Sequence, residues 1–121
     1  MRDFRKLEIW KKGILPVKEV YKLTETLPST EKFGLISQMQ RCTVSILSNI
    51  AEGFSRKSEK EYNRYLEIAI GSAFELETQL ILCSELGYAE DKEINLIIAY
   101  LNILQKQINA LISIISRSKR R

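Results

Sequence analysis

The sequence QMQRCTVSILSNIAEG, residues 38–53, carries two patterns of helical spacing at once. At 100° per residue, one face of this stretch and of the residues just before it is apolar. That face comprises Leu35, Met39, Cys42, Ile46 and Ile50. Beside it, within an arc of roughly 80°, lie the polar residues Gln38, Arg41, Ser45, Asn49 and Glu52. We predict a helix whose polar stripe needs partners elsewhere in the chain, because an unsatisfied buried polar group costs ~1–3 kcal/mol.

A matching polar stripe lies on the third helical stretch. Ser72, Glu75 and Gln79 follow one another at helical spacing, with apolar residues before and after them. Packed antiparallel, the two stripes would pair Arg41 with Glu75 and amide side chains with hydroxyl groups. We predict a mainly structural network, in which loss of Arg41 costs ~3–5 kcal/mol if the pair is enclosed. A catalytic or ligand pocket is the alternative, less favoured because neither stripe offers a nucleophile beside a base.

Several strings in the sequence together resemble a known family. They are PSTEKFGL at residues 28–35, NIAEG at residues 49–53, GS at residues 71–72, ELETQL at residues 75–80 and LGY at residues 86–88, together with Gln38, Arg41, Ser45 and Ile46. From Leu7 to about Ile115, the chain resembles the small four-helix-bundle proteins encoded in intervening sequences of bacterial 23S ribosomal RNA genes. The resemblance implies a left-handed up-down-up-down bundle that forms a homopentamer. It also implies a relation to the accessory protein of diversity-generating retroelements, which works with a reverse transcriptase and RNA.

The length and the breaks in apolar spacing predict a single domain. We expect residues 1–121 to form one all-α, antiparallel four-helix bundle, with helices at about 7–26, 33–54, 58–86 and 91–116. The longest apolar run, Leu96 to Leu101, is too short to span a bilayer. The charged start of the chain is not followed by the apolar segment of a secretory signal. We therefore expect a cytoplasmic protein without membrane association, and the family resemblance implies a bacterial one.

Apolar residues repeat at intervals of three and four on the remaining helical stretches. On the first, the spacing predicts a core stripe of Leu7, Trp10, Ile14, Val17, Tyr21 and Thr24. On the third, the stripe is Tyr62, Leu66, Ala69, Ala73, Leu76, Leu80 and Cys83, and on the fourth it is Ile94, Ile97, Leu101, Leu104, Ile108, Leu111 and Ile115. Further apolar residues widen the arc of the fourth stretch to roughly 240°, against ~100° for a typical surface helix. We therefore predict a subunit interface on this helix.

Residues for acid–base or metal chemistry are scarce in this sequence. Histidine is absent, which removes imidazole bases and imidazole metal ligands. Cys42 and Cys83 lie at apolar-face positions and are expected to be buried free thiols. Glu75 and Glu77 point about 200° apart on a helix, which does not suit a shared metal. We therefore predict a non-enzymatic protein that uses no metal and no cofactor.

Positive charge gathers in three segments that the predicted topology brings to one end of the bundle. Residues 1–12, 55–64 and 117–121 together carry a net charge of +9, which leaves −5 for the rest of the chain. We call the cations of these segments the basic pole. They are Arg2, Arg5, Lys6, Lys11, Lys12, Arg56, Lys57, Lys60, Arg64, Arg117, Lys119, Arg120 and Arg121. Helix dipoles do not account for Lys60 and Arg64, because positive charge is unfavourable early in a helix.

Two functions are compatible with these features. An oligomeric bundle could bind ribosomal RNA or other structured nucleic acid through the basic pole, which attracts phosphate groups without reading base sequence. Alternatively, the bundle could be a scaffold or adaptor that holds a protein partner and does not contact nucleic acid. The cations could also serve only to keep an oligomer soluble. We predict RNA binding, and the sequence does not identify the particular RNA or protein partner.

Overall fold

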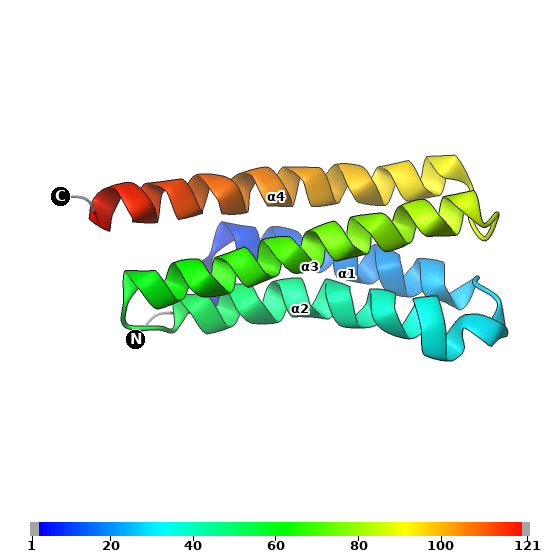
Figure 1. Cartoon of the computed structure of the whole chain (residues 1–121), viewed down its shortest axis with the longest axis horizontal. Helices are drawn as coiled ribbons and strands as arrows, with labels where there is room; N and C mark the ends of the chain where they lie inside the picture. Colours follow the sequence, from blue (N-terminus) through cyan, green and yellow to red (C-terminus); the bar gives the residue numbers. More distant parts are fainter. Residues whose placement is uncertain (1–2, 120–121) are drawn as a thin grey trace.

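The chain folds into four long antiparallel helices, as predicted (Figure 1). The computed structural model describes the backbone of residues 3–119 and the side chains of residues 3–117. The helices are α1 (Glu8–Glu25), α2 (Ser37–Phe54), α3 (Glu59–Glu85) and α4 (Asp91–Lys119). Short 3-10 helices, η1 (Phe4–Lys6) and η2 (Ser29–Glu31), precede α1 and follow it, and the π-helical segment η3 (Lys32–Ile36) leads into α2. The predicted bounds agree with these to within a few residues.

Local sequence signals explain where the helices begin and end. The Ser58 side chain accepts a hydrogen bond from the backbone N–H of Glu61 at 3.1 Å, which caps the start of α3. Gly87, with φ of 74°, adopts the left-handed conformation that terminates α3. At the same end of the bundle, Glu31 accepts hydrogen bonds from the Leu35 backbone N–H at 3.2 Å and from the Tyr88 hydroxyl at 3.1 Å. Glu31 therefore ties the α1–α2 connection to the turn between α3 and α4.

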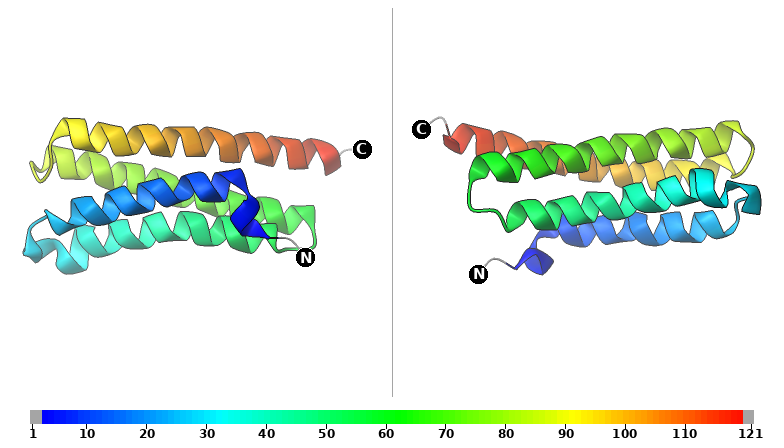
Figure 2. Two further views of the ribbon diagram at one scale, coloured as in Figure 1. Left: turned by 180° about the vertical axis from the view of Figure 1, so that it is seen from behind. Right: turned by 60° about the horizontal axis from the view of Figure 1, so that its bottom comes forward.

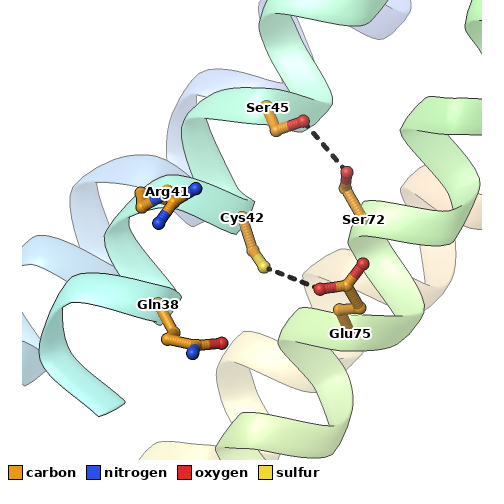
Figure 3. Close-up of a pocket in the computed structure, with 6 residues that line it drawn as sticks. All are labelled: Gln38, Arg41, Cys42, Ser45, Ser72 and Glu75. Carbon is orange, nitrogen blue, oxygen red and sulfur yellow. Dashed lines mark hydrogen bonds between the residues drawn. The ribbon is translucent and has the colours of Figure 1, made fainter. Parts of the chain in front are cut away.

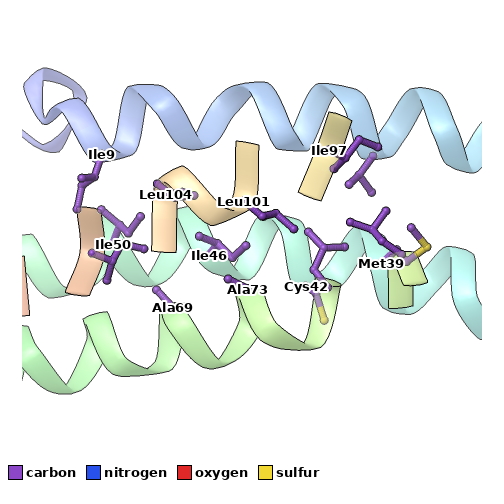
Figure 4. Packing of buried hydrophobic residues seen from close by; sticks show 14 of the residues in the cluster. Ile9, Met39, Cys42, Ile46, Ile50, Ala69, Ala73, Ile97, Leu101 and Leu104 are labelled. Carbon is purple, nitrogen blue, oxygen red and sulfur yellow. The ribbon is translucent and has the colours of Figure 1, made fainter. Parts of the chain in front are cut away.

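The core runs the length of the bundle and follows the predicted stripes on three helices (Figure 4). The stripe on α3 is buried throughout, and those on α2 and α4 are buried except for half-buried Leu35 and Leu111. Gly53 lets α2 approach α3 closely, because a Cβ atom there would lie 2.9 Å from Tyr65 Cβ and 3.2 Å from the Tyr62 carbonyl oxygen. Spacing alone was thus sufficient to predict most of the core.

The predicted core stripe of the first helix was wrong in register except at Thr24, which is buried as predicted. In the structure, α1 buries Ile9, Gly13, Pro16, Val20, Leu23 and Thr24. Trp10 lies at the edge of the core, and Tyr21 is 41% exposed. The cause is Gly13, where a Cβ atom would lie 2.6 Å from Leu47 and 3.7 Å from Leu104. Because Gly13 has no side chain, α1 packs closely against both α2 and α4 on that face.

One face of α4 stays uncovered in the single chain. Leu96, Ile103 and Ile114 are 49%, 53% and 55% exposed, and we call these three residues the outer α4 face. Over the described residues, α4 is also the one helix long and apolar enough to cross a membrane, judged by length and composition from Asp91 to Arg117. Only 28% of its most apolar window is buried inside the chain. A core helix of a soluble protein can have the same length and composition, so the apolar character of α4 does not establish a membrane span.

Candidate nucleic-acid interface

The topology brings the three basic segments to one end of the bundle, as predicted. The start of α1, the α2–α3 turn and the end of α4 lie together, and the opposite end carries the α1–α2 connection and the α3–α4 turn (Figures 1 and 2). Of the basic pole, Arg2, Arg120 and Arg121 lie outside the described residues, and Lys119 is described by its backbone only.

Three cations of the basic pole are already paired within the chain. Arg5 contacts Asp3 at 2.9 Å and Lys11 contacts Glu8 at 3.5 Å, both at exposed positions. Arg56 donates to the Glu52 carboxylate at 2.5 Å and to the Tyr65 hydroxyl at 3.2 Å, and its guanidinium lies 5.0 Å from the centre of the Tyr65 ring. The hydrogen bond from Arg56 to Glu52 raises the pKa of Arg56 above its usual value. Through these contacts, Arg56 links α2 to α3 beside the turn that connects them.

The remaining described cations of the pole have no counter-ion in the chain. They are Lys6, Lys12, Lys57, Lys60, Arg64 and Arg117, all exposed, and none forms an ion pair with any other residue that the structure describes. Lys60 and Arg64 stand in the first two turns of α3, where the helix dipole disfavours positive charge. Six unpaired cations at one end create a positive potential that attracts anions.

A groove between α3 and α4 passes along this set of cations. It has a volume of about 630 Å³ and is lined by Lys60, Asn63, Arg64 and Ser116, together with Glu61 and Glu67. Asn63 donates to the Ser116 hydroxyl at 3.0 Å and to the Ile112 carbonyl at 3.5 Å. The Asn63 side-chain oxygen is buried and accepts no hydrogen bond within the described residues. The groove therefore presents two cations, Lys60 and Arg64, beside two carboxylates, Glu61 and Glu67.

The two polar stripes face each other across α2 and α3, as the sequence suggested (Figure 3). The hydroxyl groups of Ser45 and Ser72 lie 3.0 Å apart, and Asn49 donates to the Ser45 carbonyl at 2.8 Å and to its hydroxyl at 3.0 Å. Gln79 donates to Gln38 at 3.4 Å. Between the stripes lies a pocket of about 320 Å³. Contacts thus link five members of the proposed network, and its structural role stays a prediction.

The expected ion pair between Arg41 and Glu75 is not formed. Arg41 is exposed and makes no hydrogen bond or ion pair with any described residue, whereas Glu75 accepts a bond from the Cys42 thiol at 3.6 Å. The Glu52 carboxylate likewise pairs with Arg56 and not with a residue of the polar stripe on α3. The reason is exposure: both charged side chains reach solvent at the rim of the pocket, where water competes with the pair. Burial raises the pKa of the Cys42 thiol, which is a free cysteine like Cys83.

Sequence reasoning missed a second pocket at the basic pole. Phe54 and Tyr62, on either side of the α2–α3 turn, line it together with Leu7, which precedes α1, and with residues of α4. The one signal available in the sequence was the placement of an aromatic residue before and after the basic turn at residues 55–60.

Within the described residues, no cluster of three or more cysteines, aspartates or glutamates could hold a metal ion.

These observations define an antiparallel four-helix bundle with a basic end and an uncovered apolar helix face. The family described as 23S rRNA-intervening sequence protein matches residues 5–110, and the chain belongs to this family. Its structure is similar to a crystal structure of a protein of unknown function from the S23 ribosomal protein family of Bacteroides thetaiotaomicron, with a TM-score of 0.80 and 24% sequence identity over 86% of this chain and 97% of that one. At this identity the likeness concerns the fold. No curated protein matches the chain.

Proposed function

We propose that the chain is a non-enzymatic, oligomeric protein that binds structured RNA through the basic pole. The observation that carries the proposal is a set of six exposed cations at one end of the bundle that have no counter-ion among the residues described by the structure: Lys6, Lys12, Lys57, Lys60, Arg64 and Arg117. A phosphate backbone supplies the missing negative charge, and its binding releases counter-ions from the RNA. The α3–α4 groove, with Lys60 and Arg64 at its rim, gives the backbone a surface to follow.

The outer α4 face supports an oligomer. Leu96, Ile103 and Ile114 are each about half exposed, and burial of such side chains against a second copy is favourable at roughly 25 cal/mol per Å². The family resemblance leads us to expect five subunits. A ring of parallel subunits would place all its basic poles on one side and multiply the number of phosphate contacts.

Light scattering tests the oligomer. We expect a particle several times the 14.0 kDa of one chain, reduced in size by Ile103→Glu, which places a charge on the outer α4 face. Asn102→Glu, at an exposed polar position next to it in sequence, is the matched control. A particle of monomer mass for the unaltered protein at micromolar concentration would contradict this part of the proposal.

A comparison of the RNA affinities of two charge variants tests RNA binding. A triple variant, Lys57→Gln, Lys60→Gln and Arg64→Gln, removes three unpaired cations of the basic pole. A control variant, Lys18→Gln, Lys92→Gln and Lys106→Gln, removes the same charge from positions outside the pole. We expect the first variant to bind a structured RNA more weakly than the second, with the oligomer unchanged in both. Equal affinities would instead favour a scaffold for a protein partner.

A further inference from the structure

We propose that the second pocket at the basic pole takes one unpaired nucleobase of the bound RNA. The inference rests on the proposed RNA binding and adds the recognition of unpaired nucleotides over duplex. We call this cavity the terminal pocket. It lies where the α2–α3 turn meets the start of α1 and the end of α4, and it has a volume of about 360 Å³. Small-molecule sites span ~300–1,000 Å³, so the volume of the terminal pocket lies at the small end of that range and suits a single nucleobase.

Part of the lining of the terminal pocket is apolar and aromatic. Leu111 and Ile115 of α4 line it together with Phe54 and Tyr62. The Phe54 and Tyr62 rings pack edge to face, with centroids 5.9 Å apart and planes at 65°. Tyr62 is only 7% exposed, whereas Phe54 is half-buried and keeps part of its surface accessible. An accessible aromatic surface beside aliphatic side chains is suited to stacking a flat base, and such stacking tolerates any base sequence.

The lining of the terminal pocket also includes charged residues, with Lys57 and Arg56 near the α2–α3 turn. Lys57 is exposed and has no ion pair within the described residues, whereas Arg56, next to it in the chain, is paired with Glu52. Glu59, on the opposite side of Ser58 in the chain, provides an acceptor for the N–H groups at a base edge. A free phosphate would gain nothing from the apolar residues of the pocket, and an apolar side chain of a partner would gain nothing from the Lys57 ammonium group. A base with its own phosphate uses both parts of the pocket.

The terminal pocket and the α3–α4 groove share the first turns of α3. Residues 57–59 line the pocket, and Lys60 and Arg64 line the groove. A single-stranded segment that inserts one base beside Phe54 could therefore continue with its phosphates along Lys60 and Arg64. Recognition of RNA loops and bulges by stacked bases beside cationic surfaces follows the same physical pattern.

Two comparisons test the proposal. In the first, the unaltered protein binds an RNA hairpin and the same hairpin with every loop base removed to leave abasic ribose. The phosphates are the same, so pure charge attraction predicts equal affinities. Since one stacked base contributes about 5- to 150-fold in affinity, we expect the abasic hairpin to bind at least fivefold more weakly.

In the second comparison, Phe54→Leu removes the ring but keeps an apolar side chain, and Phe33→Leu is the matched control. Phe33 is 89% exposed and belongs to η3 in the α1–α2 connection, at the opposite end of the bundle. We expect Phe54→Leu to weaken binding of the intact hairpin and to have little effect on the abasic one, whereas Phe33→Leu should change neither. Salt-dependent binding that does not distinguish the two hairpins would overturn the pocket and leave the proposed function standing. Absence of RNA binding under all conditions would overturn both, and the hairpin comparison needs no variant to fold.

Discussion

The close approach of α2 and α3 at Gly53 makes a quantitative prediction for Gly53→Ala. The added methyl would lie 2.9 Å from Tyr65 Cβ, 3.1 Å from Tyr62 Cδ1 and 3.2 Å from the Tyr62 carbonyl oxygen. Favourable carbon contacts lie at about 3.5–4.0 Å. A rotamer change cannot relieve contacts to a Cβ atom and a backbone oxygen, so α3 itself must shift. Overpacking of this kind costs ~1–3 kcal/mol, and the higher helix propensity of alanine returns about 1 kcal/mol.

Gly71→Ala is the matched control for this substitution. Gly71 lies inside α3, is exposed, and has no atom within 4 Å of the position a Cβ would take. The same chemical change should therefore stabilise the protein by about 0.5–1 kcal/mol. We expect Gly53→Ala to lower the free energy of unfolding by up to about 2 kcal/mol, and the two variants to differ by about 0.5–3 kcal/mol.

Urea denaturation of both variants at one protein concentration measures the difference, because the stability of an oligomer depends on concentration. Equal shifts of the two midpoints, or a stabilised Gly53→Ala, would refute the packing described between α2 and α3. A loss of stability in Gly71→Ala alone would instead place that face of α3 in a contact with another chain.

Three further predictions follow from single residues. Arg41→Ala should change the free energy of unfolding by no more than about 0.5 kcal/mol, because the side chain is exposed and unpaired among the described residues. A loss of several kcal/mol in urea denaturation would instead indicate that the predicted ion pair with Glu75 forms. Tyr88→Phe should cost about 1 kcal/mol in the same assay by removing the bond to Glu31, and unchanged stability would contradict that tie. Burial raises the pKa of Cys42 and Cys83, so a smaller fraction of each thiol is ionised at mildly alkaline pH. Both thiols should therefore react slowly with a thiol reagent until the protein unfolds. Immediate reaction of two thiols in the folded protein would refute their burial.

Regular spacing explains why most of the core could be predicted from the sequence. On α3 and α4 the apolar residues repeat without a break, and each of those stripes faces the centre of the bundle. On α1, two stripes compete at the same spacing, and the buried one contains Gly13 and Pro16. Those two residues weaken the apolar signal, although the lack of a side chain at Gly13 is what allows the close packing. The spacing of apolar residues therefore favoured the stripe with the larger side chains.

In the candidate site, the features that depend on topology could be predicted from the sequence, whereas those that depend on side-chain conformation could not. The order of four antiparallel helices was enough to predict that the basic segments share one end. Whether a cation is paired depends on rotamers, as for Arg56, which binds Glu52 across one helical turn. The terminal pocket needs three chain segments at once, because Phe54, Leu111 and Tyr62 come from three helices. Sequence spacing carries no information on such a meeting point.

The salt dependence of RNA binding tests the central claim most directly. Each phosphate contact contributes ~0.7 for single strands and ~0.9 for duplex to the slope of the logarithm of the affinity against the logarithm of the salt concentration. With Lys57, Lys60 and Arg64 all replaced by glutamine, we predict a slope shallower by about 2 than that of the unaltered protein. The control variant at Lys18, Lys92 and Lys106 should keep the original slope. Equal slopes of the logarithm of the affinity against the logarithm of the salt concentration for all three proteins would contradict RNA binding through the basic pole.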